Sequence, residues 1–138
     1  RAAQCMENAL DINAVSHDLS FEGRFGDGGL PEGDQVITIK GGSHHIALKG
    51  SVCSAGRKAD VVLGAWSDQS TAPTHHIDLS MLRHASGRPL TIILGRVDRS
   101  TVVFPLGAKV KTWASIGELV YWHVKRLYVA ARTRRWSW

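Results

Sequence analysis

The sequence predicts a single α+β domain with five to seven strands, one short helix and a longer C-terminal amphipathic helix. Three observations support this fold class. Short apolar segments alternate with polar residues, which is the period of half-buried strands. Glycine-rich stretches that favour turns separate these segments. Near the C-terminus the apolar residues recur instead at helical spacing.

The expected strands occupy the first three quarters of the chain. Alternation or β-branched runs predict them at six positions: 10–15, 35–40, 45–52, 59–66, 89–94 and 101–104. A glycine- and charge-rich stretch separates 45–52 from 59–66, so we expect these two strands to pair as a hairpin. The segment 89–94 is apolar enough for a buried inner strand. We detect no internal repeat in this pattern.

A short helix is expected at residues 74–84. Thr74 is a suitable N-cap, and the Ser86-Gly87 pair provides a C-terminal stop. The apolar side chains of this helix would be Ile77, Leu79, Met81 and Leu82.

A second helix is expected at residues 115–133. Ser115 and Glu118 have the spacing of a capping box, in which each side chain binds the other residue's backbone amide. Its apolar positions at helical spacing are Ile116, Leu119, Val120, Val124, Leu127 and Ala131.

Two segments together resemble a PDZ domain. Residues 28–42 (GGLPEGDQVITIKGG) are similar to the family's GL-x-x-GD turn and the strand after it, and residues 74–96 (THHIDLSMLRHASGRPLTIILGR) are similar to its second helix and final strand. The resemblance implies a PDZ-like, partly open β-barrel or sandwich over residues 1–105, with an insertion at about 43–73. Residues 106–138 would be a helical extension.

The resemblance also implies a peptide-binding groove. A peptide C-terminus would add as a strand between the segment starting at Leu10 and the helix at 74–84. The groove residues would be Leu10, Asp11, Ile12, His75, Leu79 and Leu82. Glu7 stands in the loop that would receive the carboxylate, and the family's two glycines are absent there. A degenerate groove is therefore expected, and a C-terminal-peptide adaptor is our third functional hypothesis.

Positive charge is concentrated at the C-terminus. The net charge of the 138-residue chain is +5. Residues 1–105 carry one net negative charge, whereas residues 106–138 carry seven Lys and Arg against one acid, together with four of the five tryptophans. This composition predicts a segment that contacts a partner or an anionic surface. The residues expected to make the contact are Trp113, Trp122, Lys125, Arg126, Arg132, Arg134, Arg135, Trp136 and Trp138.

The sequence offers no convincing catalytic or cofactor-binding pattern. The histidines include two adjacent pairs, His44-His45 and His75-His76, but a metal site needs three or four converging ligands. Neighbouring side chains of a strand point to opposite faces, so His44 and His45 are not expected to chelate together, and no metal site is expected. Ser86 follows His45 and Asp60 in the order of some viral proteases, but about 40 residues are too few for that double barrel. Residues 26–33 lack the GK[ST] of a phosphate-binding loop.

These observations favour a non-catalytic interaction or scaffold subunit of a larger assembly, with no cofactor. The alternative is a nucleic-acid-associated protein, such as one bound to the ribosome. The chain contains no run of 18 apolar residues and begins at Arg1, which permits a removed presequence. We expect an organelle, a plastid or a mitochondrion, and a position peripheral to a membrane complex. Cys5 and Cys53 are expected as separate thiols, with a disulfide left open.

Overall fold

The computed structural model describes residues 9–26, 35–56, 58–64 and 72–112, together with residues 120, 123–125, 127–128 and 131–132. Within these described residues, nine strands form two sheets in which every pairing is parallel. Sheet A contains, in spatial order, β1 (Leu10–Ile12), β3 (Gln35–Ile39), β5 (Ala59–Leu63), β7 (Thr91–Leu94) and β9 (Lys109–Thr112). Sheet B contains β2 (His17–Phe25), β4 (His44–Val52), β6 (His75–His84) and β8 (Val102–Val103).

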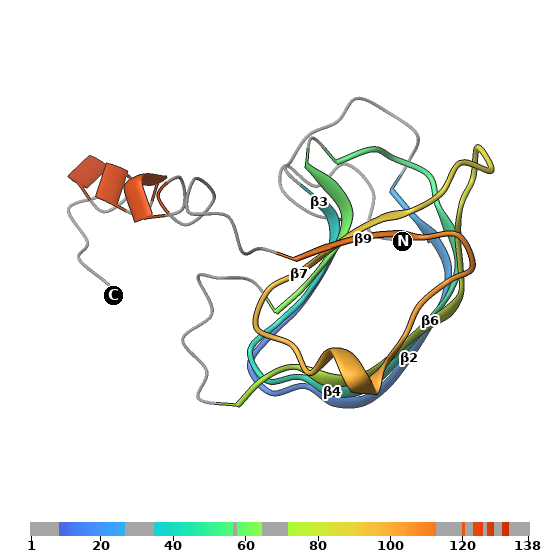
Figure 1. The fold of residues 1–138 in the computed structure, drawn as a ribbon, viewed down its shortest axis with the longest axis horizontal. Helices are drawn as coiled ribbons and strands as arrows, with labels where there is room; N and C mark the ends of the chain where they lie inside the picture. The colour runs from blue at the N-terminus through green and yellow to red at the C-terminus, as the bar shows by residue number, and fades with distance from the viewer. Residues whose placement is uncertain are drawn as a thin grey trace.

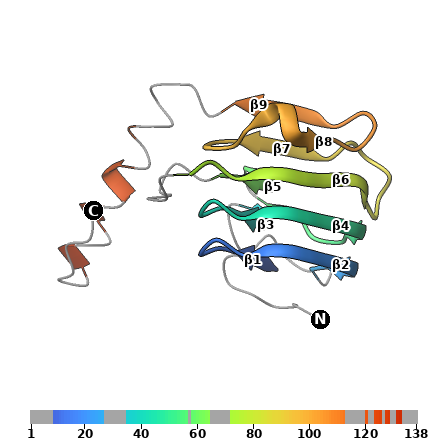
Figure 2. The ribbon, with the colours of Figure 1, turned by 90° about the horizontal axis from the view of Figure 1, so that it is seen from below.

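The chain alternates between the sheets, so each strand pairs with the strand two positions earlier in the sequence. Viewed end on, the sheets face one another as the two sides of a coil (Figure 1). From the side, successive coils stack as rungs (Figure 2). This architecture is a two-sheet parallel β-solenoid, in which each coil supplies the backbone hydrogen bonds and the apolar surface that its neighbours need.

Equivalent residues of successive coils stand above one another. In sheet B, His17 pairs with His44 and His44 with His75. The coils therefore contain 27 and then 31 residues between these equivalent positions. The internal repeat that sequence inspection missed has a period typical of solenoids, although the loops vary its length.

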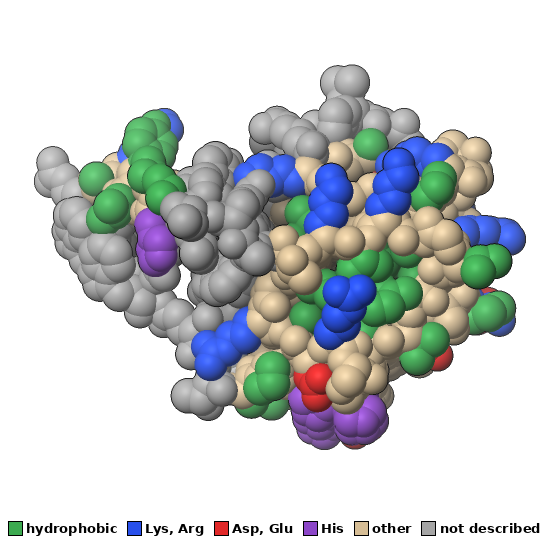
Figure 3. Space-filling model, viewed as in Figure 1, with side chains coloured by type: hydrophobic (Ala, Val, Ile, Leu, Met, Phe, Trp, Pro, Cys, Tyr) green, Lys and Arg blue, Asp and Glu red, His purple; other side chains and the backbone are tan. Residues whose placement is uncertain are grey.

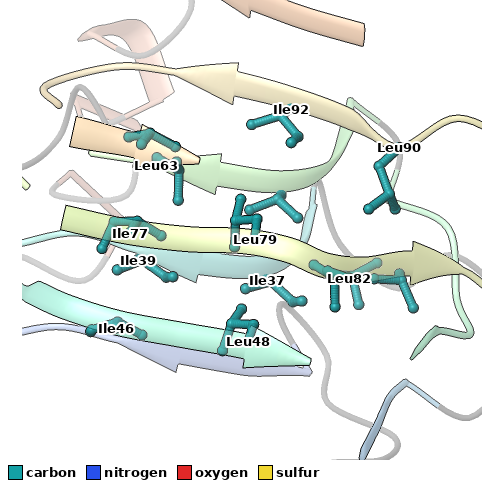
Figure 4. Packing of buried hydrophobic residues seen from close by; sticks show 14 of the residues in the cluster. Ile37, Ile39, Ile46, Leu48, Leu63, Ile77, Leu79, Leu82, Leu90 and Ile92 are labelled. Carbon is teal, nitrogen blue, oxygen red and sulfur yellow. The ribbon is translucent and has the colours of Figure 1, made fainter. Parts of the chain in front are cut away.

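The core lies between the two sheets and is aliphatic. Sheet A contributes residues such as Ile37, Ile39 and Ile92, and sheet B contributes Ile46 and Leu79 from the opposite side (Figure 4). All five side chains are at most 1% exposed. Alternation along each strand sends the intervening side chains to the outer faces. On sheet A these include Val62 and Ile93, which are also buried, whereas the intervening side chains of β2 and β6 in sheet B are largely exposed. The outer face of sheet B is thus free to carry functional groups without weakening the core.

The predicted PDZ-like fold is wrong. A PDZ domain is an antiparallel barrel, whereas the strands here are parallel, and residues 75–84 form strand β6 instead of a groove helix. A β-bulge explains the error, because the register between β4 and β6 shifts by one residue between Asp78 and Met81. The bulge returns Leu82 to the core, so Ile77, Leu79 and Leu82 depart from strict alternation and imitate helical spacing. The PDZ-like turn at 27–34 lies outside the described residues.

Six strand predictions are confirmed, since β1, β3, β4, β5, β7 and β8 fall within or next to the expected segments. The predicted hairpin is wrong, because β4 and β5 belong to different sheets and pair with other strands. Strands β2 and β9 were not predicted. Both carry mostly exposed side chains, so the apolar signal that marks a strand is weak in them.

The described residues within the predicted helix 115–133 are helical, which confirms that element where it can be compared. A short 3-10 helix, η1 (Arg99–Thr101), lies between β7 and β8 and has Asp98 as its N-cap. Within the described part of the chain, helices long and apolar enough to cross a membrane are not found.

Candidate functional site

Histidine side chains gather at one corner of the solenoid, where the strands of sheet B begin. Figure 3 shows them at the lower edge of the molecule, beside an acidic side chain. Three coils place a pair of residues at this corner: His17-Asp18, His44-His45 and His75-His76. We call these six residues the histidine corner. Sheet register stacks the pairs into two columns, one of three histidines and one of Asp18 with two histidines.

The rings within each column are stacked. The ring centroids of His17 and His44 are 5.1 Å apart, and those of His44 and His75 are 4.8 Å apart, with both ring pairs nearly parallel. In the second column the His45 and His76 ring centroids are 4.5 Å apart and the rings are again nearly parallel. These spacings match the separation of neighbouring strands, so the backbone ladder itself sets the distance between rings.

An unusual backbone conformation brings the two columns together. The second residue of each pair is left-handed, with φ of 56° at Asp18, 54° at His45 and 52° at His76. Aspartate and histidine are among the residues that adopt this conformation most readily. The kink places adjacent side chains on one side of the chain, which invalidates the expectation that they point to opposite faces. The Nδ1 atoms are 2.8 Å apart in His44-His45 and 2.7 Å apart in His75-His76.

Two hydroxyl side chains stabilise the backbone of the corner through hydrogen bonds. Ser43 is fully buried, and its hydroxyl donates to the Lys40 carbonyl at 2.8 Å and accepts from the Ser16 amide at 3.2 Å. At the other end of the corner, the His76 amide donates to the Thr101 hydroxyl at 2.8 Å. The η1 helix therefore follows His76 at one end of the histidine stack. Hydrogen bonds thus hold the backbone of the corner at both ends.

The electrostatics of the corner lower the pKa of His75 and that of Asp18, which favours a neutral His75 imidazole and an ionised Asp18 carboxylate. Burial lowers the pKa of His75, and the neighbouring His44, His76 and His45 lower it further, while Asp98 acts in the opposite direction. The hydrogen bond from His17 is the largest cause that lowers the pKa of Asp18. At neutral pH, His75 therefore keeps a lone pair on its ring.

Three rings of the corner converge most closely. His45, His75 and His76 each offer a ring nitrogen, and these atoms all lie within 4.8 Å of one another. His45 and His76 are exposed and His75 is partly buried, so solvent reaches the group. Neutral imidazole nitrogen is a preferred ligand of zinc, copper and nickel.

The structure separates the residues predicted to line a peptide groove. Leu10, Asp11 and Ile12 lie in β1 of sheet A, whereas His75, Leu79 and Leu82 lie in β6 of sheet B. Ile12, Leu79 and Leu82 are buried in the core, so they cannot contact a peptide. Of the six, His75 alone belongs to the histidine corner.

The protease-like triad is not assembled. His45 is the second residue of β4, and Ser86 follows the far end of β6. Asp60 instead accepts two hydrogen bonds from the Arg88 guanidinium, at 2.9 and 2.8 Å. The Ser86 hydroxyl lies 2.8 Å from Nδ1 of His84, the last residue of β6, and the second ring nitrogen of His84 is 3.2 Å from the Ser54 carbonyl.

The predicted C-terminal contact residues are described only in part. Lys125 and Arg132 are exposed on helical backbone, and Arg132 donates to the Tyr128 hydroxyl at 3.2 Å. The others lie outside the described residues: Trp113, Trp122, Arg126, Arg134, Arg135, Trp136 and Trp138. Large apolar side chains on the same segment are exposed, namely Val120, Val124, Leu127 and Tyr128.

Searches against protein-family models, curated proteins and solved structures return no match for this chain. The fold and the corner therefore define its class by themselves, as a two-sheet parallel β-solenoid that carries a stacked histidine corner. One sequence signal would have located the corner. The pattern His-[Asp/His]-[Leu/Ile]-x-[Phe/Leu] occurs at 17–21, 44–48 and 75–79, and aligning these segments exposes both the repeat and the histidine columns.

Proposed function

We propose that the protein is a non-catalytic interaction module, a structural subunit that attaches to a larger assembly through its basic C-terminal helix. The observation that carries this proposal is the exposed apolar face of that helix. Val120, Val124, Leu127 and Tyr128 follow one another at helical spacing and are between 42% and 61% exposed. An amphipathic helix gains most of its stability by burying such a face, so we expect this face to bind a partner.

The charges around this face suggest the chemistry of the partner. Lys125 and Arg132 lie on the same helical segment, and residues 106–138 carry seven Lys and Arg against one acid. We infer a partner protein with an apolar groove and an acidic rim, because such a surface buries the apolar side chains and pairs with the basic ones. The solenoid body is a suitable scaffold, since its aliphatic core is closed and its outer faces are regular.

A capture experiment with matched variants tests this proposal. The intact chain is used as bait in a native extract, and captured proteins are identified by mass spectrometry and tested again in purified form. The helix variant V124E/L127E should lose the partner, because both substitutions put a carboxylate on the apolar face. The variant V103E is the control, since Val103 is 52% exposed on the solenoid body. It should retain the partner.

Two other results would contradict the proposal. If the intact chain binds vesicles of anionic phospholipid and V124E/L127E does not, with no purified protein partner, the helix is a membrane anchor. If instead the chain binds RNA with an affinity that falls steeply with salt, the basic segment serves a nucleic acid.

A further inference from the structure

We propose that His45, His75 and His76 form a binding site for one divalent transition-metal ion of the zinc, copper, nickel and cobalt type. The site is independent of the C-terminal helix, so it can exist whether or not the proposed attachment is correct. It uses residues that the interaction function leaves without a role. The argument rests on the geometry of the corner, the packing of the rings and their accessibility.

Geometry is the first support. In a tetrahedral zinc site the nitrogen ligands lie about 2.0–2.1 Å from the metal, which puts them about 3.3 Å from one another. The Nδ1 atoms of His75 and His76 are already 2.7 Å apart, and the three ligand atoms fall within 4.8 Å. The required separation lies between these two values. Small rotations of exposed rings are therefore enough to bring the three nitrogens around one ion.

The fold preorganises this arrangement. Two ligands come from one strand because His76 is left-handed, and the third comes from the neighbouring strand at the equivalent left-handed position, His45. The solenoid ladder fixes the spacing between the strands, and the Thr101 hydroxyl binds the His76 amide. Ligands on rigid elements lose little freedom when a metal binds, which favours affinity.

Packing of the rings is the second support. His45 and His76 are stacked with their ring centroids 4.5 Å apart, so their orientations are already related to one another. His44, from the same strand as His45, stacks on His75 and restricts the orientation of its ring. Asp18 stands in the same column as His45 and His76, and its carboxylate supplies negative charge that partly offsets the charge of a bound cation.

The ligand set selects the class of metal. Imidazole nitrogens suit zinc, copper and nickel, whereas magnesium and calcium prefer oxygen ligands. Three protein ligands leave at least one coordination position of a tetrahedral ion open, and exposure of His45 and His76 directs that position to solvent. The site can therefore accept water or a side chain of a bound partner as its last ligand.

The test uses the intact chain, free of any histidine tag, titrated with Co²⁺ alone and followed by visible absorption and calorimetry. We expect one equivalent to bind and Zn²⁺ to displace it. His45→Asn and His76→Asn should each weaken binding by at least about tenfold, since each removes a ligand. Asparagine tolerates left-handed backbone, so these exposed positions should fold as before. Mg²⁺ and Ca²⁺ should not compete.

Two further variants are controls of the same substitution. His84→Asn removes an imidazole at the far end of β6, and His17→Asn removes a ring of the stack outside the three-ligand group. Both should bind Co²⁺ like the natural chain. Unchanged affinity in His45→Asn and His76→Asn would overturn the proposal, as would equal loss in His84→Asn. Failure of the natural chain to bind one equivalent would overturn it too, and none of these results depends on capturing a partner.

Discussion

A buried ion pair ties two successive coils together, and removing it should destabilise the solenoid measurably. Asp60 in β5 is 2% exposed, and it accepts two hydrogen bonds from Arg88 and one from the Thr91 amide at 2.8 Å. Removing one partner of a buried pair costs about 3–5 kcal/mol. The Arg88 side chain is 40% exposed and can be rehydrated, so Asp60→Ala belongs at the lower end, about 3 kcal/mol. Arg88→Ala leaves a buried carboxylate and belongs nearer 4 kcal/mol.

A double-mutant cycle measures this coupling. The free energy of unfolding is obtained from urea denaturation followed by far-UV circular dichroism, for both single variants and the double variant. Once the carboxylate is gone the guanidinium contributes little, so the double variant should lose about as much as Asp60→Ala alone. The interaction energy is then about 4 kcal/mol, the loss caused by Arg88→Ala when Asp60 is present. Additive losses in the double variant would refute the reasoning, because they would mean that the two side chains act separately.

Three further substitutions have defined outcomes. Leu79→Ala, at a side chain with no exposure, should cost about 2–5 kcal/mol in urea denaturation, whereas Met81→Ala on the same strand, 61% exposed, should cost under about 0.5. Gly41→Ala should lower the melting temperature more than Gly87→Ala. Both glycines have positive φ, but only at Gly41 would a new Cβ collide with the backbone of the preceding coil. Equal melting temperatures would contradict this. Because folding lowers the pKa of His75, stability should fall as the pH drops below about 6.5, and His75→Asn should flatten that dependence.

The strands were largely predictable from the sequence, but their partners were not. Alternation in 35–40 and the apolar run in 89–94 report that a segment is half buried or buried, and the structure confirms both as strands. Neither pattern carries information about which strand lies alongside. Nearness in sequence suggested a hairpin of β4 with β5, whereas the solenoid pairs β4 with strands about 30 residues away.

The histidine corner was hidden for two physical reasons. The left-handed backbone at His45 and His76 reverses the usual alternation of side chains, and the local sequence does not predict this conformation. The stacking of the columns depends on register between coils, so it becomes visible only when the repeated His-[Asp/His] segments are aligned with one another. The exposed apolar face at Val120 and Val124 was easier to predict, because helical spacing is a local property.

Disulfide trapping tests the stacked coils most directly. Neighbouring strands are about 4.8 Å apart, and a disulfide needs Cα atoms about 4.4–6.8 Å apart. Ser20 pairs with Ala47, and Ala47 pairs with Asp78 on the next coil. In a background with Cys5 and Cys53 replaced by serine, S20C/A47C should therefore oxidise readily under mild conditions. S20C/D78C, two strands or about 9.6 Å apart, should remain reduced. Rapid crosslinking of S20C/D78C, or none in S20C/A47C, would contradict the solenoid and the histidine corner that depends on it.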